Sequence, residues 1–267
     1  MKIAILADSL ALPREDVSAE RALEATYPFL LDQSLRHHYG AHAPLVIERG
    51  MRRRTIEYVL DDWCEQVVLK NPDMVVIHVG IVDCAPRVFL RRERAFVERM
   101  RFTRLRDRIL RFAHDHRRAI TKRLPRVYVP LARFEGHVKE IVQKVQEQDI
   151  RSLIFVNIIS PPDSVEQRSF GFQRNVEFYN QVLQDQTRHR NISLIDLNKL
   201  IKSQGGADKL TVDGIHLNEE GHQMLAQQIE TRVIALLEEN VTPGLEEAQP
   251  KVTVMNDVTA QPWKAKA

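Results

Sequence analysis

The sequence has little cysteine and no grouping of residues typical of a metal site. Cys64 and Cys84 are the only cysteines among 267 residues, too few for a disulfide framework and at no spacing typical of a metal site. Each has an apolar neighbour, so we interpret both as small core side chains. Histidine pairs such as His37-His38 have no clear carboxylate or cysteine companion at ligand spacing. We therefore expect no metal and no cofactor.

Long apolar runs are also absent. No stretch approaches the roughly 18 residues that a membrane-spanning helix needs. At the N-terminus, Met1 and Lys2 are followed by only five apolar residues before Asp8, whereas the apolar core of a secretory signal needs about 7 or more. We interpret Lys2–Leu6 as a buried strand instead, and expect a soluble, cytoplasmic protein.

Negative charge is scarce in one segment. From Arg87 to Arg126 there are 15 Lys or Arg but only 4 Asp or Glu, although the whole chain carries a net charge of only +3. Three interpretations stay open: a solvated helix face, attraction to an anionic membrane surface, or attraction to a polyanion such as acidic polysaccharide or nucleic acid. No nucleic-acid-binding motif accompanies the charge, so among functional partners we favour an acidic polysaccharide or a membrane surface with peripheral association.

The pattern of apolar residues predicts an α/β protein. Nearly continuous apolar runs, typical of strands covered on both faces, alternate with helix-like stretches, which predicts right-handed βαβ units. We expect a three-layer α/β/α sandwich around a five-stranded parallel sheet. The predicted strands span 2–6, 44–48, 74–79, 153–159 and 192–197, and the predicted helices 18–38, 55–69, 174–187 and 218–239, with several helices within 88–148.

We expect one domain over residues 1–239. The segment 87–148 is too long for one crossover helix, so we interpret it as a basic helical insertion whose apolar residues, such as Phe96, Phe102 and Phe112, pack on the core. Beyond 240 the composition turns to Pro, Gly, Glu, Ala and Lys without periodicity, which predicts a disordered tail over 240–267.

Ser9 follows directly after the first predicted strand. Ligands bind at the carboxyl ends of strands in an open α/β sheet. A serine there, at the turn into a helix, lies near backbone N–H groups that can stabilise an oxyanion. Ser9 is therefore a candidate nucleophile; the alternative is a helix N-cap.

Asp213 and His216 supply the partners that a serine nucleophile needs. A hydroxyl needs a base, and the base needs a carboxylate that orients it. Three residues apart in a turn that Gly214 makes flexible, the two side chains can face one side. Their position after the last predicted strand, matched by Ser9 after the first, favours a Ser-His-Asp triad.

Three blocks resemble those of the SGNH (GDSL-like) hydrolases. Asp8-Ser9-Leu10 is similar to their nucleophile block, although Ala7 stands where that motif has glycine. Gly80-Ile81-Val82-Asp83 occurs where the family has Gly-x-Asn-Asp, and Asp213-Gly214-Ile215-His216 resembles their closing Asp-x-x-His. The resemblance implies a flavodoxin-like sandwich, with Ser9 as nucleophile, His216 as base and Asp213 orienting the base.

The resemblance also implies an oxyanion hole made of three donors. The first is the backbone N–H of Ser9. The second is a backbone N–H after the second strand, for which Gly50 is the obvious candidate, although counting back from Thr55 selects Arg53. The third is the amide of the family's asparagine, which is missing here because position 82 is valine.

Arg14, Asp83 and Arg87 lie on loops next to the expected site. Arginine can hold an anionic or sugar-bearing substrate by paired hydrogen bonds, so we expect these three residues to bind substrate; for the arginines, surface solvation is the alternative.

We therefore expect a serine esterase or O-deacylase acting on a small acyl ester by an acyl-enzyme mechanism, with an acylated carbohydrate as one candidate substrate. Transfer of the acyl group to a sugar hydroxyl would need the same base. The alternative is a non-catalytic SGNH-fold module that binds glycan or organises a biosynthetic complex at a membrane surface; Ala7 and Val82 favour it, and the intact triad opposes it.

Overall fold

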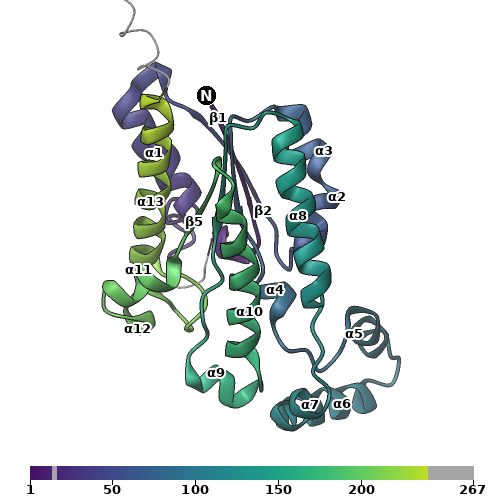
Figure 1. Cartoon of the computed structure of the whole chain (residues 1–267). Coiled ribbons are helices and arrows are strands. Elements are labelled where there is room, and N and C mark those ends of the chain that lie inside the picture. The colour runs from purple at the N-terminus through teal and green to yellow at the C-terminus, as the bar shows by residue number, and fades with distance from the viewer. Residues whose placement is uncertain (14–16, 240–267) are drawn as a thin grey trace, which may run out of the picture.

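The computed structural model describes residues 1–13 and 17–239 (Figure 1). Arg14, expected at the substrate, lies outside the described residues, as does the tail over 240–267 that was expected to be disordered. Along the described ranges, no helix combines the length and the apolar character that crossing a membrane requires.

A sheet of five parallel strands forms the centre of the molecule. Its strand order is β2-β1-β3-β4-β5, which confirms the predicted fold class and is the flavodoxin-like order. After β1 the chain forms β2 on one side and then crosses to β3 on the other, so a crevice opens at the carboxyl end of β1. The strands are β1 (Lys2–Ala7), β2 (Leu45–Gly50), β3 (Met74–His78), β4 (Ser152–Val156) and β5 (Ile192–Ile195).

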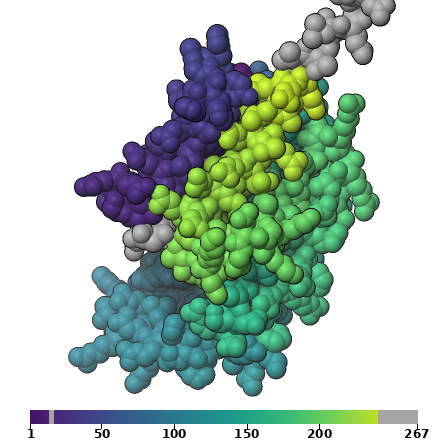
Figure 2. Space-filling model, turned by 90° about the vertical axis from the view of Figure 1, so that its left-hand side faces the viewer, coloured from purple at the N-terminus to yellow at the C-terminus, as the bar shows by residue number. Residues whose placement is uncertain are grey.

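Two apolar cores, one on each face of the sheet, make the three layers. Alternate residues of β1 point to opposite faces, as the period of a strand requires: Ile3 and Ile5 belong to one core, and Ala4 and Leu6 to the other. Helices α1 and α13 pack on each other over the first face, as Figure 2 shows, and α2, α3, α8 and α10 cover the second.

The helices and short 3-10 turns follow the predicted alternation, with additions. The α-helices are α1 (Tyr27–Tyr39), α2 (Ile56–Asp61), α3 (Trp63–Gln66), α4 (Ile81–Cys84), α5 (Arg91–Glu98), α6 (Thr103–Asp115), α7 (Arg117–Arg123), α8 (Leu131–Glu147), α9 (Asp163–Arg168), α10 (Phe172–Asp185), α11 (Leu197–Ser203), α12 (Ala207–Leu210) and α13 (Glu219–Glu238). The 3-10 turns are η1 (Ser9–Ala11), η2 (Gly40–His42), η3 (Val68–Lys70) and η4 (Gln186–Arg188).

The first helix begins later than the sequence predicts. The expected helix over 18–38 starts at Tyr27, with Pro28 in its first turn. Proline is tolerated there because its missing N–H has no partner at a helix start. Residues 18–26 form turns instead.

Helices α5, α6 and α7 project beyond the carboxyl ends of the strands (Figure 1). We call these three helices the basic arm. The rest of the expected insertion, α8, is a sheet-covering helix. The expectation that the arm's phenylalanines pack on the core is wrong: Phe96, Phe102 and Phe112 are 72%, 76% and 58% exposed. The buried apolar side chains of the arm are small, among them Val97 and Ala113.

Candidate active site

Ser9 lies at the crevice between the two halves of the sheet. It begins η1 one residue after the end of β1, and the side chain of the intervening Asp8 caps this turn by accepting a hydrogen bond from the N–H of Leu10 at 2.9 Å. The last residue of β1, Ala7, pairs with the ends of both β2 and β3. Loops after three strands therefore meet around the Ser9 hydroxyl.

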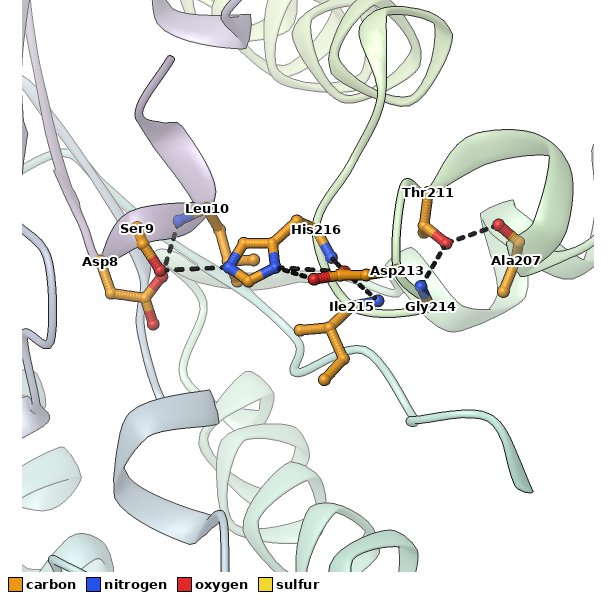
Figure 3. A network of polar contacts seen from close by, with 9 residues as sticks. All are labelled: Asp8, Ser9, Leu10, Ala207, Thr211, Asp213, Gly214, Ile215 and His216. Atoms are coloured by element: carbon orange, nitrogen blue, oxygen red, sulfur yellow. Dashed lines mark hydrogen bonds and ion pairs between the residues drawn. The ribbon is translucent and has the colours of Figure 1, made fainter. Parts of the chain in front are cut away.

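A chain of polar contacts runs from Ser9 to His216 to Asp213 (Figure 3). Ser9 Oγ lies 3.4 Å from His216 Nε2, and His216 Nδ1 lies 2.8 Å from Asp213 Oδ2. The structure thus brings together side chains more than 200 residues apart in the sequence. A hydroxyl–imidazole distance at the long end of hydrogen bonding is usual before substrate binds.

The Asp213 carboxylate is held in its ionised form. Partial burial disfavours the charge, but hydrogen bonds from the side chain and backbone of His216 and from the N–H of Ile215 outweigh it, so the pKa of Asp213 lies well below its usual range. An ionised carboxylate keeps the proton of His216 on Nδ1 and leaves Nε2 able to accept one from Ser9.

Gly214 allows the turn between these two residues. Its φ of +81° is a conformation that favours glycine, and a Cβ there would lie 2.4 Å from Cγ of Pro162. Its N–H donates to Thr211 Oγ1 at 3.0 Å, and an antiparallel bridge between Thr211 and Leu217 closes the turn. The turn is therefore fixed both by its own backbone and by the loop after β4.

Gly50 and Arg53, the two candidates for the second oxyanion donor, differ in whether their backbone N–H is already hydrogen-bonded. The N–H of Gly50 donates to the side chain of Glu48, and is thereby occupied. Arg53 has a φ of +63°, and across the described residues its N–H has no hydrogen-bond partner. The left-handed conformation at Arg53 is one that glycine adopts most easily. Of the two candidates left open by the sequence, Arg53 has the available N–H.

The loop after β3 carries Val82, Asp83 and Arg87. Val82 is buried in α4, and its carbonyl accepts from Arg87 Nη2 at 2.7 Å. Asp83 is fully buried and accepts from the N–H of Ile56 at 3.0 Å. That position makes Asp83 an anchor between α4 and α2 and corrects the expectation that it contacts substrate, because solvent does not reach it.

A second histidine near the site, His78, is unable to serve as the base. It ends β3, is fully buried, and burial together with His222 lowers its pKa to about 3. Its ring lies 5.7 Å from that of Tyr27, which stacks on His222 at 5.8 Å. His78 is therefore neutral near pH 7 and belongs to the packing behind the nucleophile.

Two residues that support the site were not singled out from the sequence. Asn175 on α10 donates to the carbonyl of Cys84 at 2.8 Å and so fixes the end of α4. Pro162 packs on Gly214. The Pro161-Pro162 pair marks a loop at the carboxyl end of β4, but its partner becomes visible only in the fold. In the part of the chain that the structure describes, no three His, Cys, Asp or Glu side chains gather as a metal site.

The chain matches a known protein family over most of its length. The model of the GDSL-like Lipase/Acylhydrolase family matches residues 8–224, a range that runs from the nucleophile turn into α13. No curated protein matches the chain.

Solved structures of the same fold include several esterases. The lipase/acylhydrolase from Enterococcus faecalis is 20% identical, with 88% of this chain and 96% of that chain covered and a TM-score of 0.60. The acetyl xylan esterase AlAXEase is 18% identical, with 87% and 100% covered and a TM-score of 0.59. A catalytic mutant of the acetylxylan esterase Axe2 from Geobacillus stearothermophilus is 19% identical, with 87% and 93% covered and a TM-score of 0.56.

Proposed function

The chain belongs to the GDSL-like lipase/acylhydrolase family and is an ester-hydrolysing enzyme; we propose that it is a serine esterase that removes a small acyl group from a carbohydrate. The observation that carries this proposal is the chain of contacts from Ser9 Oγ through His216 to Asp213. Without it, a serine at a strand end would have no base.

In the proposed first step, Ser9 Oγ attacks the carbonyl carbon of the ester. His216 Nε2 takes the hydroxyl proton as the new C–O bond forms, and Asp213 stabilises the resulting imidazolium. The tetrahedral intermediate collapses by breaking the bond to the alcohol, which leaves with the proton from His216. The acyl group then remains on Ser9 as an ester.

In the second step, His216 removes a proton from water, which attacks the acyl-enzyme and releases the acid. A sugar hydroxyl in place of water would give acyl transfer with the same proton steps. Water and alcohol need the same base, so the triad suits both reactions.

The backbone N–H groups of Ser9 and Arg53 are the proposed oxyanion donors. Across the described residues neither N–H has a hydrogen-bond partner, and each donor of this kind contributes about 2.7–4 kcal/mol to the transition state. Val82 supplies no third donor. We therefore propose slower turnover of simple esters than an oxyanion hole with three donors would give.

Support for a carbohydrate as the leaving alcohol comes from proteins of the same fold. Two of the esterases named above are described as acetyl xylan esterases. An acetylated sugar is accordingly the proposed substrate class, with acetate as the small acyl group.

Labelling with a fluorophosphonate tests the proposal directly, because the probe reacts only with an activated serine. We expect a covalent adduct on Ser9, detected by mass spectrometry, that is lost in Ser9→Ala and in His216→Ala. Ser160→Ala, which removes an exposed serine on the loop after β4, is the matched control and should label like the wild type. Equal labelling of the wild type and Ser9→Ala would overturn the proposal, and no labelling of either would favour the non-catalytic glycan-binding alternative.

A further inference from the structure

Two adjoining cavities lie where the basic arm meets the sheet. The first has a volume of about 290 Å³, and the second about 510 Å³, the latter within the range of about 300–1,000 Å³ for ligand pockets. Arg94 and Tyr128 line both. The cavities are therefore neighbours on either side of these two residues.

The second cavity begins beside the reaction centre. Met51, one of its lining residues, donates its N–H to the carbonyl of Ala7 at 3.1 Å, two residues before Ser9. Arg53, whose N–H is the proposed oxyanion donor, lines the same cavity. A molecule in this cavity thus lies against the loop that faces the ester carbonyl.

The lining of the two cavities is strongly basic. Of the lining residues that the structure describes, Glu98 alone is a carboxylate, and it pairs with Arg94 at 2.7 Å. Five other lining arginines have no carboxylate within 4.0 Å among the described residues: Arg52, Arg53, Arg87, Arg91 and Arg117. Their positive charge therefore has no counter-ion within residues 1–13 and 17–239.

Two of these arginines are also largely removed from water. Burial lowers the pKa of Arg87, and the nearby Arg117 lowers it further. Burial and repulsion from Arg168 likewise lower the pKa of Arg117. The buried Nε of Arg87 has no hydrogen-bond partner among the described residues. A bound oxyanion would relieve the repulsion and satisfy this donor.

Aromatic rings hold the guanidinium groups in place. The Arg87 guanidinium lies 4.2 Å from the ring centre of Tyr128, and that of Arg91 lies 5.0 Å from the same ring and 4.7 Å from the ring of Tyr58. Stacked guanidinium planes are pre-arranged for paired hydrogen bonds to a carboxylate or phosphate. The cavities thus combine flat aromatic faces with fixed cations.

We propose that these cavities bind an anionic sugar, so that the substrate is an acylated carbohydrate bearing carboxylate or phosphate groups. The inference rests on the proposed esterase function and further specifies that the substrate is negatively charged. A concave, arginine-lined space fits a discrete oxyanion on a sugar. A membrane surface would instead meet the outer face of the arm, where Phe96 and Phe102 are exposed.

Binding is best measured without turnover, in full-length Ser9→Ala protein by calorimetry. The ligands are oligogalacturonate for carboxylate, mannose 6-phosphate for phosphate and xylo-oligosaccharide as the neutral sugar. We expect at least one anionic ligand to bind about tenfold or more tightly than the neutral one at roughly 50 mM salt, and more weakly as salt screens the charge. Whichever anion binds identifies the oxyanion.

Substitutions locate the binding. Arg117→Gln and Arg94→Gln should each weaken binding of the anionic ligand by about tenfold, since each removes a charge-assisted contact. Arg111→Gln, which removes an exposed arginine of α6 that lines neither cavity, is the matched control and should bind normally. Equal loss in all three variants would overturn the proposal, because the effect would then belong to the general charge of the arm.

Kinetics separate this inference from the esterase proposal. With wild-type enzyme we expect kcat/KM for acetylated oligogalacturonate, or for an acetylated sugar phosphate, to exceed that for neutral acetylated xylo-oligosaccharide by about tenfold or more. Arg117→Gln should reduce this ratio of kcat/KM values. If Ser9 turns over p-nitrophenyl acetate but kcat/KM is the same for the anionic and the neutral acetylated sugars, the proposal of an anionic substrate is wrong and the esterase proposal stands. If no turnover depends on Ser9, the esterase proposal is wrong, and binding of the anionic sugar is then judged by calorimetry alone.

Vesicles containing phosphatidylglycerol test the membrane alternative. Binding to these vesicles without binding to either anionic sugar would mean that the arm docks on membranes and would overturn the inference.

Discussion

Asp8 and Asp83 are two fully buried carboxyls near the nucleophile, and a negative charge on Asp83 disfavours ionisation of Asp8. Burial raises the pKa of Asp83 to about 7, and burial together with a smaller contribution from Asp83 raises the pKa of Asp8 to about 8. One oxygen of each accepts a backbone N–H, from Leu10 and Ile56, and the other oxygen has no partner among the described residues. The folded protein therefore holds protons that the unfolded chain would release.

Asp83→Asn should change how stability depends on pH. An unfolded aspartate ionises near pH 4, whereas burial keeps the folded Asp83 protonated up to about pH 7, with Glu57 raising and Arg91 lowering this value. The folded state thus binds more protons between about pH 4 and 7, and the stability that this residue contributes falls as pH rises through that window. Asparagine cannot ionise, so the Tm of the variant minus that of the wild type should rise from pH 5 to 8.

Differential scanning fluorimetry in steps of pH measures this difference. Asp61→Asn changes an exposed side chain of α2 and is the control, for which the difference should vary much less. A constant difference for Asp83→Asn over the same range would mean that the folded protein does not hold the proton.

Asp213→Asn should nearly abolish catalysis and leave the fold intact. The amide oxygen can still accept the backbone N–H groups of Ile215 and His216, so the turn can persist, but the carboxylate no longer orients the imidazole. Comparable substitutions lower kcat by about 10⁴. The measurement is kcat for p-nitrophenyl acetate, with circular dichroism as the check on folding; Asp208→Asn, at an exposed acid of α12, should retain full activity. An active Asp213→Asn enzyme would require another partner for His216.

The three central strands, β1, β3 and β4, were predictable because they are covered on both faces. Burial on both sides demands a nearly continuous apolar run, which is why β1 and β3 were predicted to within one residue at each end. The shortest helices could not be predicted, because they leave no periodic pattern of apolar residues in the sequence. The four residues of α4 and of α12 complete little more than one turn, too few for a 3.6-residue period to show in the sequence.

The order of the motifs predicted that Ser9, Asp213 and His216 lie together, as the structure shows, whereas several supporting contacts were not predictable. Choosing between Gly50 and Arg53 required the backbone conformation and the partner of each N–H. Asp83 follows the family pattern in sequence, but only the packing of α4 against α2 reveals that it is out of reach of solvent. Exposure of Phe96 likewise depends on where the arm projects, which no local pattern encodes.

Gly214→Ala should damage the catalytic turn more than Gly206→Ala does. Both glycines have positive φ, +81° and +97°, but an added Cβ meets Pro162 Cγ at 2.4 Å only in the first case. Backbone strain at a positive φ costs about 1–3 kcal/mol at either site, and overpacking adds about 1–3 kcal/mol at Gly214. Urea unfolding should therefore give a larger loss for Gly214→Ala, with a fall in kcat that Gly206→Ala lacks.

A double variant isolates the contact. Pro162→Ala removes the colliding atoms and should recover part of the stability lost in Gly214→Ala, since the two residues touch. If the losses of stability in Gly214→Ala and in Pro162→Ala simply add in the double variant, the strain lies in the backbone alone and Pro162 does not constrain the turn.

Val82→Asn should accelerate hydrolysis, because it restores an amide where the family pattern has asparagine. Val82 is 8% exposed in α4, and Arg87 holds its carbonyl at 2.7 Å, so the backbone at this position is already fixed. One oxyanion donor changes kcat by on the order of 10²–10³ when its geometry is optimal; for an amide placed on an unadapted loop we expect a gain of at least about tenfold in kcat for p-nitrophenyl acetate. Val82→Leu has the same branching at Cγ as asparagine but no donor and should show no gain, which separates hydrogen bonding from the change of side-chain shape. If the wild type is already fast and Val82→Asn is no faster than Val82→Leu, a different group donates to the oxyanion and the two-donor account fails.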